Sequence, residues 1–227
     1  MKPTPVWLFD LDNTLHDASR AAFGMIDRAM TDYIVRELGV SREQADFLRR
    51  DYWRRYGATL LGLVRHHQVN APHFLKHTHA LPGLEDELHT HAHDRAALRQ
   101  LPGRKYVLTN APAAYAHRVL DALGLADCFD DVLCIEDMCM FGQYRPKPDA
   151  RMLRHVLARL KVPAHRCILV EDTLAHQKSA RGLGMKTVWM QRYMRRNSHG
   201  PEVGVYVRRR PCYVHARIRS LQKLREL

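Results

Sequence analysis

The stretch that decides the fold is Val6-Trp7-Leu8-Phe9-Asp10-Leu11-Asp12-Asn13-Thr14-Leu15, near the N-terminus. Its apolar beginning is typical of a short buried strand in a parallel sheet. The apolar run ends directly in Asp10 and Asp12, which are separated by one residue. Because ligands of open α/β sheets bind beyond the carboxyl ends of the strands, this strand end is the first candidate for a functional site.

Further short apolar runs alternate with helical patterns along the chain. The runs are Tyr106–Leu108, Val132–Ile135, Cys167–Val170 and Thr187–Met190, and the helical patterns between them include Ala113–Leu123 and Asp149–Leu160. This alternation predicts an α/β fold in which helices cover a parallel sheet. We expect Asp149 to cap the helix that follows it.

The long interval between the first and second apolar runs breaks the alternation. Two helical patterns, Ala18–Leu38 and Arg42–Tyr56, follow each other there without an intervening strand. We therefore predict that a helical cap is inserted into the α/β core after its first strand. The predicted parts are residues 1–16 and 86–190 for the core, 17–85 for the cap, and 191–227 for a basic C-terminal extension that packs on the core.

Charge and hydropathy narrow the class of protein. The chain has 227 residues, with 36 Lys and Arg against 24 Asp and Glu, and a formal net charge of +12. This excess favours anionic partners such as phosphate-bearing metabolites or nucleic acid. No apolar run approaches the ~20 residues that span a bilayer, and the N-terminus lacks the layout of a signal peptide, so we predict a cytoplasmic protein with no membrane partner.

Polar side chains also follow two other predicted strands. Thr109 and Asn110 follow the second apolar run, and Glu171 and Asp172 follow the fourth. With the aspartates after the first strand, they are expected to converge at one edge of the sheet. Carboxylates gathered in one place repel each other and need positive charge beside them. An oxygen-rich set suits Mg²⁺, and Lys147 would add a second positive charge.

Four motifs resemble, in order and spacing, those of the haloacid dehalogenase-like (HAD) hydrolase superfamily. They are Phe9-Asp10-Leu11-Asp12-Asn13-Thr14-Leu15, Leu108-Thr109-Asn110, Lys147-Pro148 and Val170-Glu171-Asp172-Thr173. The resemblance covers about residues 5–190 and implies a Rossmann-like three-layer core, with a parallel sheet and an inserted helical cap. It also implies a phosphatase, because dehalogenases of this superfamily lack an acid at the position of Asp12.

The resemblance implies a role for each motif residue. Asp10 would attack phosphorus and form an aspartyl-phosphate. Asp12 would protonate the departing alkoxide and then deprotonate the water that hydrolyses this intermediate. Thr109 and the backbone amide of Asn110 would bind phosphoryl oxygens. Lys147 would position Asp10 and offset developing charge.

The resemblance further implies a Mg²⁺ cofactor. The ion would be held by the carboxylates of Asp10 and Asp172 and the backbone carbonyl of Asp12, with Glu171 bound directly or through water. One position departs from the family pattern, because His176 stands where an Asp or Asn is frequent. An imidazole can still hydrogen-bond in the outer shell of such a site.

The predicted cap contains Tyr56-Gly57-Ala58-Thr59-Leu60-Leu61-Gly62-Leu63 followed by His66-His67, which resembles the pyrimidine 5′-nucleotidase branch of the superfamily. This implies a nucleoside 5′-monophosphate as substrate, with a pyrimidine base preferred, and makes Tyr56, Leu60 and His67 candidates for substrate binding. Two alternatives stay open. One is a HAD phosphatase for another small phosphate, such as a sugar phosphate or phosphoglycolate. The other is a nucleic-acid-binding protein on a degenerate HAD core, which the intact motifs disfavour.

Two further patterns lead to structural expectations. Histidines recur every second residue or so at His77, His79, His89, His91 and His93, and we interpret them as a solvated run, with Leu84–Leu98 helical. In the C-terminal extension, alternating valines within Pro201–Arg210 predict an edge strand, and Val214–Leu227 shows a helical pattern.

Overall fold

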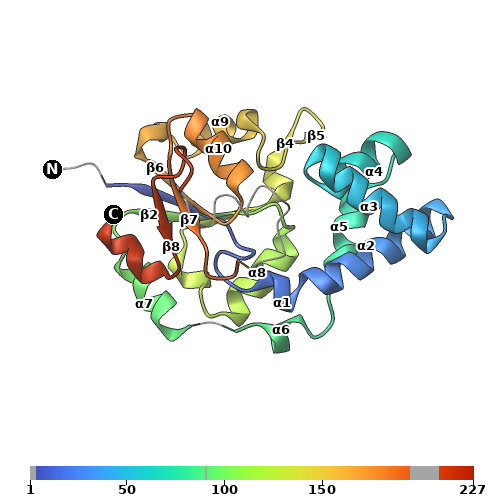
Figure 1. Cartoon of the computed structure of the whole chain (residues 1–227), viewed down its shortest axis with the longest axis horizontal. Helices are drawn as coiled ribbons and strands as arrows, with labels where there is room; N and C mark the ends of the chain where they lie inside the picture. The colour runs from blue at the N-terminus through green and yellow to red at the C-terminus, as the bar shows by residue number, and fades with distance from the viewer. Residues whose placement is uncertain (1–3, 90, 195–209) are drawn as a thin grey trace.

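The computed structural model, drawn in Figure 1, describes residues 4–89, 91–194 and 210–227. Its main sheet has six strands in the order β3-β2-β1-β6-β7-β8, and neighbouring strands run parallel. The strands are β1 Val6–Phe9, β2 Arg104–Leu108, β3 Asp131–Leu133, β6 Cys167–Glu171, β7 Lys186–Met190 and β8 Ala216–Ile218. The predicted α/β fold with a parallel sheet is confirmed.

Helices cover both faces of the sheet and make three layers (Figure 1). On one face lie α7 (Ala92–Gln100), α8 (Ala113–Ala122) and the 3₁₀ helix η4 (Leu221–Glu226), and on the other lie α9 (Ala150–Arg159) and α10 (Leu174–Gly182). Asp149 caps α9 as predicted, since its carboxylate accepts from the backbone amides of Arg151 and Met152.

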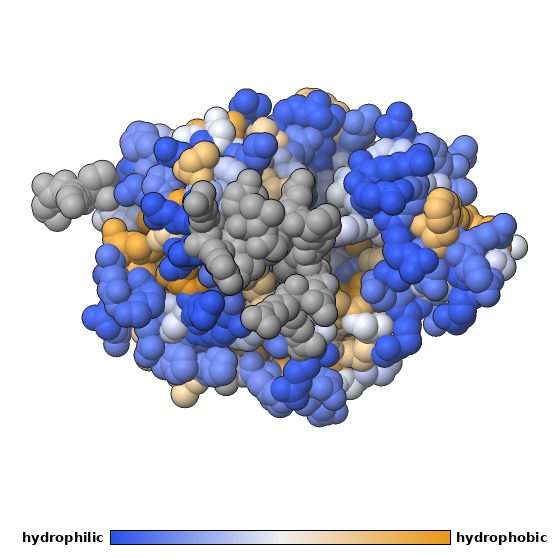
Figure 2. Space-filling view, viewed as in Figure 1, coloured by the Kyte–Doolittle hydropathy of each residue, from blue (hydrophilic) through white to orange (hydrophobic). Residues whose placement is uncertain are grey.

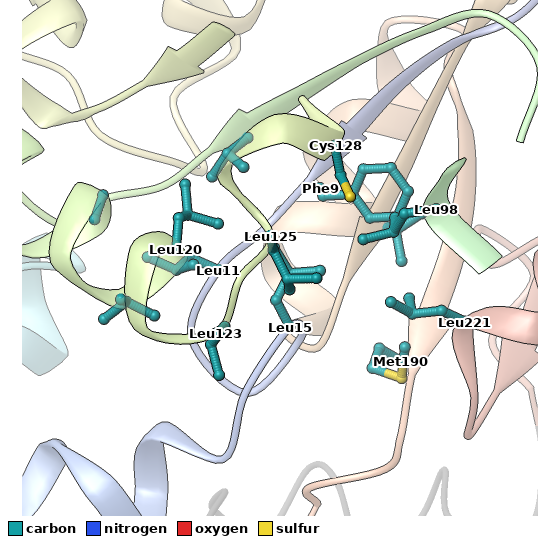
Figure 3. Packing of buried hydrophobic residues seen from close by; sticks show 14 of the residues in the cluster. Phe9, Leu11, Leu15, Leu98, Leu120, Leu123, Leu125, Cys128, Met190 and Leu221 are labelled. Atoms are coloured by element: carbon teal, nitrogen blue, oxygen red, sulfur yellow. The ribbon is translucent and has the colours of Figure 1, made fainter. Parts of the chain in front are cut away.

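The alternation of side chains along β1 explains the two apolar layers. Trp7 and Phe9 point into the layer under α7 and α8, whereas Val6 and Leu8 point into the layer under α9. Successive side chains of a strand face opposite sides, so a strand that is covered on both sides must be apolar throughout. Figure 3 shows the first layer, where Leu98 of α7 and Cys128 lie beside Phe9, Leu120 of α8 lies beside Leu11, and Leu221 of η4 lies near Met190.

Five helices follow β1, within the predicted insertion at residues 17–85, and we propose them as its cap. They are α1 Ala18–Ala21, α2 Phe23–Leu38, α3 Arg42–Tyr56, α4 Thr59–His67 and α5 Ala71–Thr78. The last four lie beside the core in Figure 1 and share an apolar cluster, which Ile135 of the core also joins. Gly62 lets α3 and α4 approach closely, because a Cβ there would lie 2.1 Å from Cγ of Tyr52.

Two predicted helices are interrupted. Ala18–Leu38 is divided at Ala22, whose backbone leaves the helical region with φ −127° and ψ −45°. Leu84–Leu98 is divided into α6 (Leu84–Glu87) and α7, because Leu88 adopts an extended backbone. Leu88 is buried in the same apolar layer as Leu84, and this tertiary contact overrides the local helical pattern.

The predicted C-terminal helix Val214–Leu227 is wrong. Residues Ala216–Ile218 form β8, which pairs with β7 and extends the sheet, and only η4 follows. Strand pairing with β7 is a tertiary interaction that a periodicity within Val214–Leu227 does not reveal. The edge strand predicted within Pro201–Arg210 lies almost entirely outside the described residues.

The remaining elements are short. They are the hairpin β4 (Cys139–Met140) and β5 (Gln143–Tyr144), and the 3₁₀ helices η1 Ala126–Cys128, η2 Ile135–Met138 and η3 Ala164–Arg166. On the face seen in Figure 2, the described surface is mostly hydrophilic, with separate hydrophobic patches. Among the described residues, no helix has the length and apolar character of a membrane span.

Candidate active site

Three neighbouring strands bring the first candidate residues together. β1 lies between β2 and β6, with Phe9 paired to Val107 on one side and to Val170 on the other. The strands therefore end at the same edge, where Asp10 follows β1, Thr109 follows β2 and Glu171 is the last residue of β6. The Asp10 amide donates to the carbonyl of Val170 at 2.9 Å, which extends the ladder to the site itself.

Lys147 connects two of these carboxylates. Its Nζ donates to Oδ1 of Asp10 at 2.6 Å and to Oε2 of Glu171 at 2.8 Å, and the residue is only 1% exposed. Burial by itself would lower the pKa of Lys147, but Asp10 and Glu171 hold that pKa above its usual value. The lysine therefore carries a full positive charge inside the protein.

Asn110 holds the backbone that presents this lysine. Its Nδ2 donates to the Lys147 carbonyl at 3.0 Å, and its Oδ1 accepts from the Lys147 amide at 2.8 Å. The side chain of Asn110 thus joins the loop after β2 to the loop before α9. We predicted a role for its backbone amide, and this positioning of Lys147 by its side chain is additional.

Glu171 is the most enclosed of the carboxylates, with 0% exposure. Its Oε2 also lies 3.0 Å from Nδ1 of His176, and its Oε1 accepts from the amide of Thr173 at 3.1 Å. Burial alone would raise the pKa of Glu171, but Lys147 and His176 hold it well below its usual range. The departure at His176 thus places an imidazole against Glu171, where it helps to keep that carboxylate ionised.

Oxygens of Asp10, Glu171 and Asp172 form a group that could hold a metal ion, since one oxygen from each lies within 4.8 Å of the others. Burial, with the negative charge of Glu171, raises the pKa of Asp10 to about 8 and that of Asp172 well above its usual value. Burial is the larger cause of both shifts, and Lys147 offsets the shift of Asp10 only in part. An all-oxygen set with excess negative charge fits a hard divalent cation.

Asp12 lies apart from this cluster and is held by other residues. Its Oδ1 is 3.0 Å from Nε2 of His16 and accepts from the hydroxyl of Tyr115 at 2.8 Å. The carboxylate stays 20% exposed, whereas His16 and Tyr115 are buried. Asp12 therefore remains accessible beside Asp10 while its orientation is fixed from within.

The partners of Asp12 were not predicted from the sequence. Tyr115 lies on the apolar side of α8 with Ala116, Val119 and Leu120, where a tyrosine looks like ordinary core. His79 also approaches, and its ring is 5.7 Å from that of Tyr115. His79 is partly buried and its Nδ1 lies 2.9 Å from the hydroxyl of Thr78, so this histidine departs from the predicted solvated run. The other four histidines of that run are exposed: His77, His89, His91 and His93. Burial lowers the pKa of His79 to about 4.

Thr109 occupies the predicted place at the end of β2. It is buried, and its Oγ1 accepts from the amide of Ala111 at 3.0 Å. A hydroxyl that accepts one hydrogen bond can still donate one, so Thr109 retains a donor for an anionic oxygen. Its contact with a phosphoryl group stays a prediction.

The three cap candidates differ in their surroundings. Leu60 is 3% exposed and belongs to the apolar cluster of the cap, so it is placed to support the helices rather than to contact a ligand. The hydroxyl of Tyr56 is 2.6 Å from Nε2 of His66, and Nε2 of His67 is 2.8 Å from the hydroxyl of Tyr52. Tyr56 and His67 therefore belong to two tyrosine–histidine pairs between α3 and α4.

The end of α3 reaches the loop that carries Lys147. A Cβ on Gly57 would lie 3.9 Å from Cδ of Pro148, the residue after that lysine. The segment that begins at Tyr56 is thus adjacent to the charged cluster, although it lies about ninety residues earlier in the chain. A substrate bound at Asp10 would have this segment of the cap within reach.

Known protein families and individual proteins are similar to this chain in sequence. A sequence model described as haloacid dehalogenase-like hydrolase matches residues 6–184. A curated relative, Phosphate metabolism protein 8 of Saccharomyces cerevisiae, is 25% identical over 193 residues, which is 79% of this chain and 59% of the relative. The chain thus spans about three fifths of the length of that relative.

Solved structures share the fold over nearly their whole length. A HAD phosphatase from Thermococcus onnurineus has a TM-score of 0.63 at 20% identity, with 98% of this chain and 97% of that chain covered. A 2-haloacid dehalogenase from Pseudomonas syringae pv. Tomato DC3000 has a TM-score of 0.59 at 22% identity, with 99% and 97% covered. Because both kinds of enzyme match about equally, the fold does not choose between them.

Proposed function

This chain belongs to the haloacid dehalogenase-like hydrolase family, and we propose that it is a magnesium-dependent phosphatase that hydrolyses phosphomonoesters through an aspartyl-phosphate on Asp10. Pyrimidine nucleoside 5′-monophosphates are the proposed preferred substrates. The observation that carries the proposal is the carboxylate of Asp12, two residues after Asp10, which stays partly accessible and is held by Tyr115 and His16 rather than by Lys147. A departing alkoxide needs a proton, and a halide does not.

The two aspartates divide the chemistry. Asp10 acts as the nucleophile, and Lys147 holds its Oδ1 and offsets negative charge that develops on the phosphoryl group. Asp12 protonates the leaving oxygen and afterwards takes a proton from the attacking water. Thr109 and the amide of Asn110 bind phosphoryl oxygens.

Asp10, Asp172 and the backbone carbonyl of Asp12 are the residues proposed to hold the magnesium ion. Glu171 is paired with Lys147 and His176, and we propose that it acts on the ion through water. When bound, the ion supplies positive charge that offsets the carboxylates and the phosphate. The clustering of one oxygen each from Asp10, Glu171 and Asp172 within 4.8 Å supports the need for that charge.

The cap supports the proposed preference for a nucleotide. The pairs Tyr56–His66 and Tyr52–His67 place several aromatic rings on α3 and α4, next to the loop of Lys147. Aromatic faces are suited to stacking on a base, and a phosphate bound at Asp10 would direct the rest of the substrate toward the cap. Closure of a cap over a substrate would also exclude water.

A panel of phosphate esters tests this function. The purified protein would be assayed with Mg²⁺ on UMP, CMP, AMP, a sugar phosphate, phosphoglycolate and p-nitrophenyl phosphate, and kcat/KM compared. We expect the pyrimidine nucleotides to have the highest kcat/KM. A higher value for phosphoglycolate or the sugar phosphate would retain the phosphatase and remove the base preference. No turnover of any ester would overturn the proposed reaction.

A further inference from the structure

Both hydrogen bonds to the Asp12 side chain end on the same oxygen. Oδ1 is contacted by His16 at 3.0 Å and by Tyr115 at 2.8 Å. Across the described ranges 4–89, 91–194 and 210–227, Oδ2 accepts no hydrogen bond. The two oxygens of one carboxyl group are therefore in different environments.

Both contacts supply hydrogens. Tyr115 is fully buried, and its hydroxyl donates to Oδ1 of Asp12 at 2.8 Å. A carboxylate oxygen accepts, and therefore Nε2 of His16 carries the hydrogen in that contact. Two donors occupy the acceptor positions of Oδ1, and a proton on the carboxyl group is left with Oδ2.

We propose that Tyr115 and His16 are positioning residues that hold Oδ1 of Asp12 as an acceptor and present Oδ2 to the reacting groups. The inference rests on the proposed phosphatase function. It adds which oxygen of Asp12 transfers the proton and which residues select it. Neither residue contacts the substrate, so their effect is exerted through Asp12.

With Oδ2 as the oxygen that transfers the proton, the reaction has two half-reactions. In the first half-reaction an Asp10 oxygen bonds to phosphorus, the bond from phosphorus to the leaving oxygen breaks with its electron pair on that oxygen, and the proton on Oδ2 moves to it. In the second, Oδ2 takes a proton from water while the water oxygen bonds to phosphorus, and the bond from Asp10 to phosphorus breaks. Phosphate leaves and both aspartates return to their initial states.

The position of the two donors in the chain supports a fixed geometry. His16 lies two residues before the first cap helix, and Tyr115 belongs to α8 in the core layer. The ring of Tyr115 also packs edge-on against His79, which follows the last cap helix. The two chain segments that connect core and cap, near His16 and near His79, thus both lie close to Asp12. Its carboxyl group therefore has little freedom to rotate.

The decisive variant is Tyr115→Phe, which removes one donor and keeps the ring. The substrates are p-nitrophenyl phosphate, whose leaving group departs without a proton, and a simple alkyl phosphate, whose leaving group requires one. Since kcat/KM covers only the steps through release of the leaving group, we expect it to fall 10- to 100-fold for the alkyl ester and less than threefold for the aryl ester. The expected fall for the alkyl ester does not exceed the lower end of the ~10²–10⁴-fold that complete general acid catalysis typically contributes. Where hydrolysis of the phosphoenzyme limits turnover, kcat falls for both.

His16 provides an independent pair of variants. His16→Gln keeps an N–H donor near the position of Nε2, whereas His16→Leu removes it. We expect Gln to retain the wild-type ratio of alkyl to aryl kcat/KM and Leu to lower that ratio. If Tyr115→Phe does not fold, as judged by circular dichroism, this pair decides the question. Tyr33→Phe is the matched control, because it removes another buried hydroxyl, 2.8 Å from His73, at a distance from the site.

A parallel fall of kcat/KM for both esters in Tyr115→Phe and His16→Leu would overturn the inference, because it indicates a structural role. An unchanged ratio in both variants would overturn it as well. If the wild-type protein hydrolyses neither ester, the proposed function fails and the inference with it. If substitution of Asp12 abolishes turnover but Tyr115→Phe and His16→Leu do not change it, the inference is overturned and the proposed function stands.

Discussion

The charged cluster of the core and the tyrosine–histidine pairs of the cap are built in opposite ways. In the core, Asp10, Lys147 and Glu171 come from three distant segments and are almost completely buried. In the cap, the tyrosine–histidine pairs join two consecutive helices, and both histidines are exposed. A buried charge without its partner costs several kcal/mol, whereas an exposed hydrogen bond costs little to exchange. We therefore expect the core to constrain the reaction and the cap to set the substrate.

Asp10→Asn is expected to give the largest effect, since it removes the nucleophile and leaves a side chain of nearly equal shape. Turnover of every substrate should fall on the order of 10³-fold or more. Steady-state assays on UMP and p-nitrophenyl phosphate would measure it, with circular dichroism as the control for folding. Activity within tenfold of wild type would remove Asp10 from its proposed role.

Removal of divalent ions should stop turnover of all substrates alike. EDTA should abolish activity and added Mg²⁺ restore it, whereas Ca²⁺ should substitute poorly because its longer bonds and flexible coordination do not align the reacting groups as tightly. Activity assays after dialysis against chelator would measure the effect. Full activity in Ca²⁺, or with no divalent ion, would contradict the proposed site.

Lys147→Ala tests the interdependence of the core cluster. It leaves Asp10 and Glu171 without their shared cation, and breaking a buried pair typically costs about 3–5 kcal/mol. We expect a lower free energy of unfolding by urea and a fall in kcat/KM that is similar for a nucleotide and for p-nitrophenyl phosphate. An effect on only one substrate would show that the core also selects the substrate.

Substitutions in the cap should instead depend on the substrate. Tyr56→Ala and His67→Ala should each lower kcat/KM for UMP by roughly 1–3 kcal/mol and change that for p-nitrophenyl phosphate much less. Leu60→Ala is the matched control, because Leu60 is buried in the same helices and its loss should mainly reduce stability. Parallel losses for both substrates would mean that this segment does not choose the base.

His79 gives a smaller effect, at the connection between the two regions. Burial lowers its pKa from 6.5 to about 4 in the folded state, so the unfolded chain binds a proton more readily between these pH values. Stability from this group is present above pH 6.5 and is lost as pH falls toward 4. Between pH 7 and pH 5 the wild type should lose about 2 kcal/mol more unfolding free energy than His79→Gln. Equal losses in urea titrations would contradict the assignment.

The local sequence pattern was sufficient to locate the strands that are buried on both faces of the sheet, because burial on both faces requires apolar residues throughout. The apolar runs that become β1, β6 and β7 could be located because a covered parallel strand admits few polar residues. It failed for β8, whose pairing with β7 is formed by segments far apart in the chain. It also failed at Leu88, where burial against the core ends a helix that the local pattern continues.

The sequence by itself determined which chemical groups are present and that they follow strand ends, as with Asp10, Asp12, Thr109 and Asp172. Only the tertiary structure decided how these groups are held. Tyr115 is indistinguishable from core along α8, and its hydroxyl gains a role only because α8 packs where β1 ends. Leu60 was predicted from the sequence to contact the substrate, and only the tertiary structure shows that its side chain is buried in the apolar cluster of the cap. The reason is physical: periodicity reports whether a side chain is buried, whereas the partner of a buried polar group depends on which distant segment covers it.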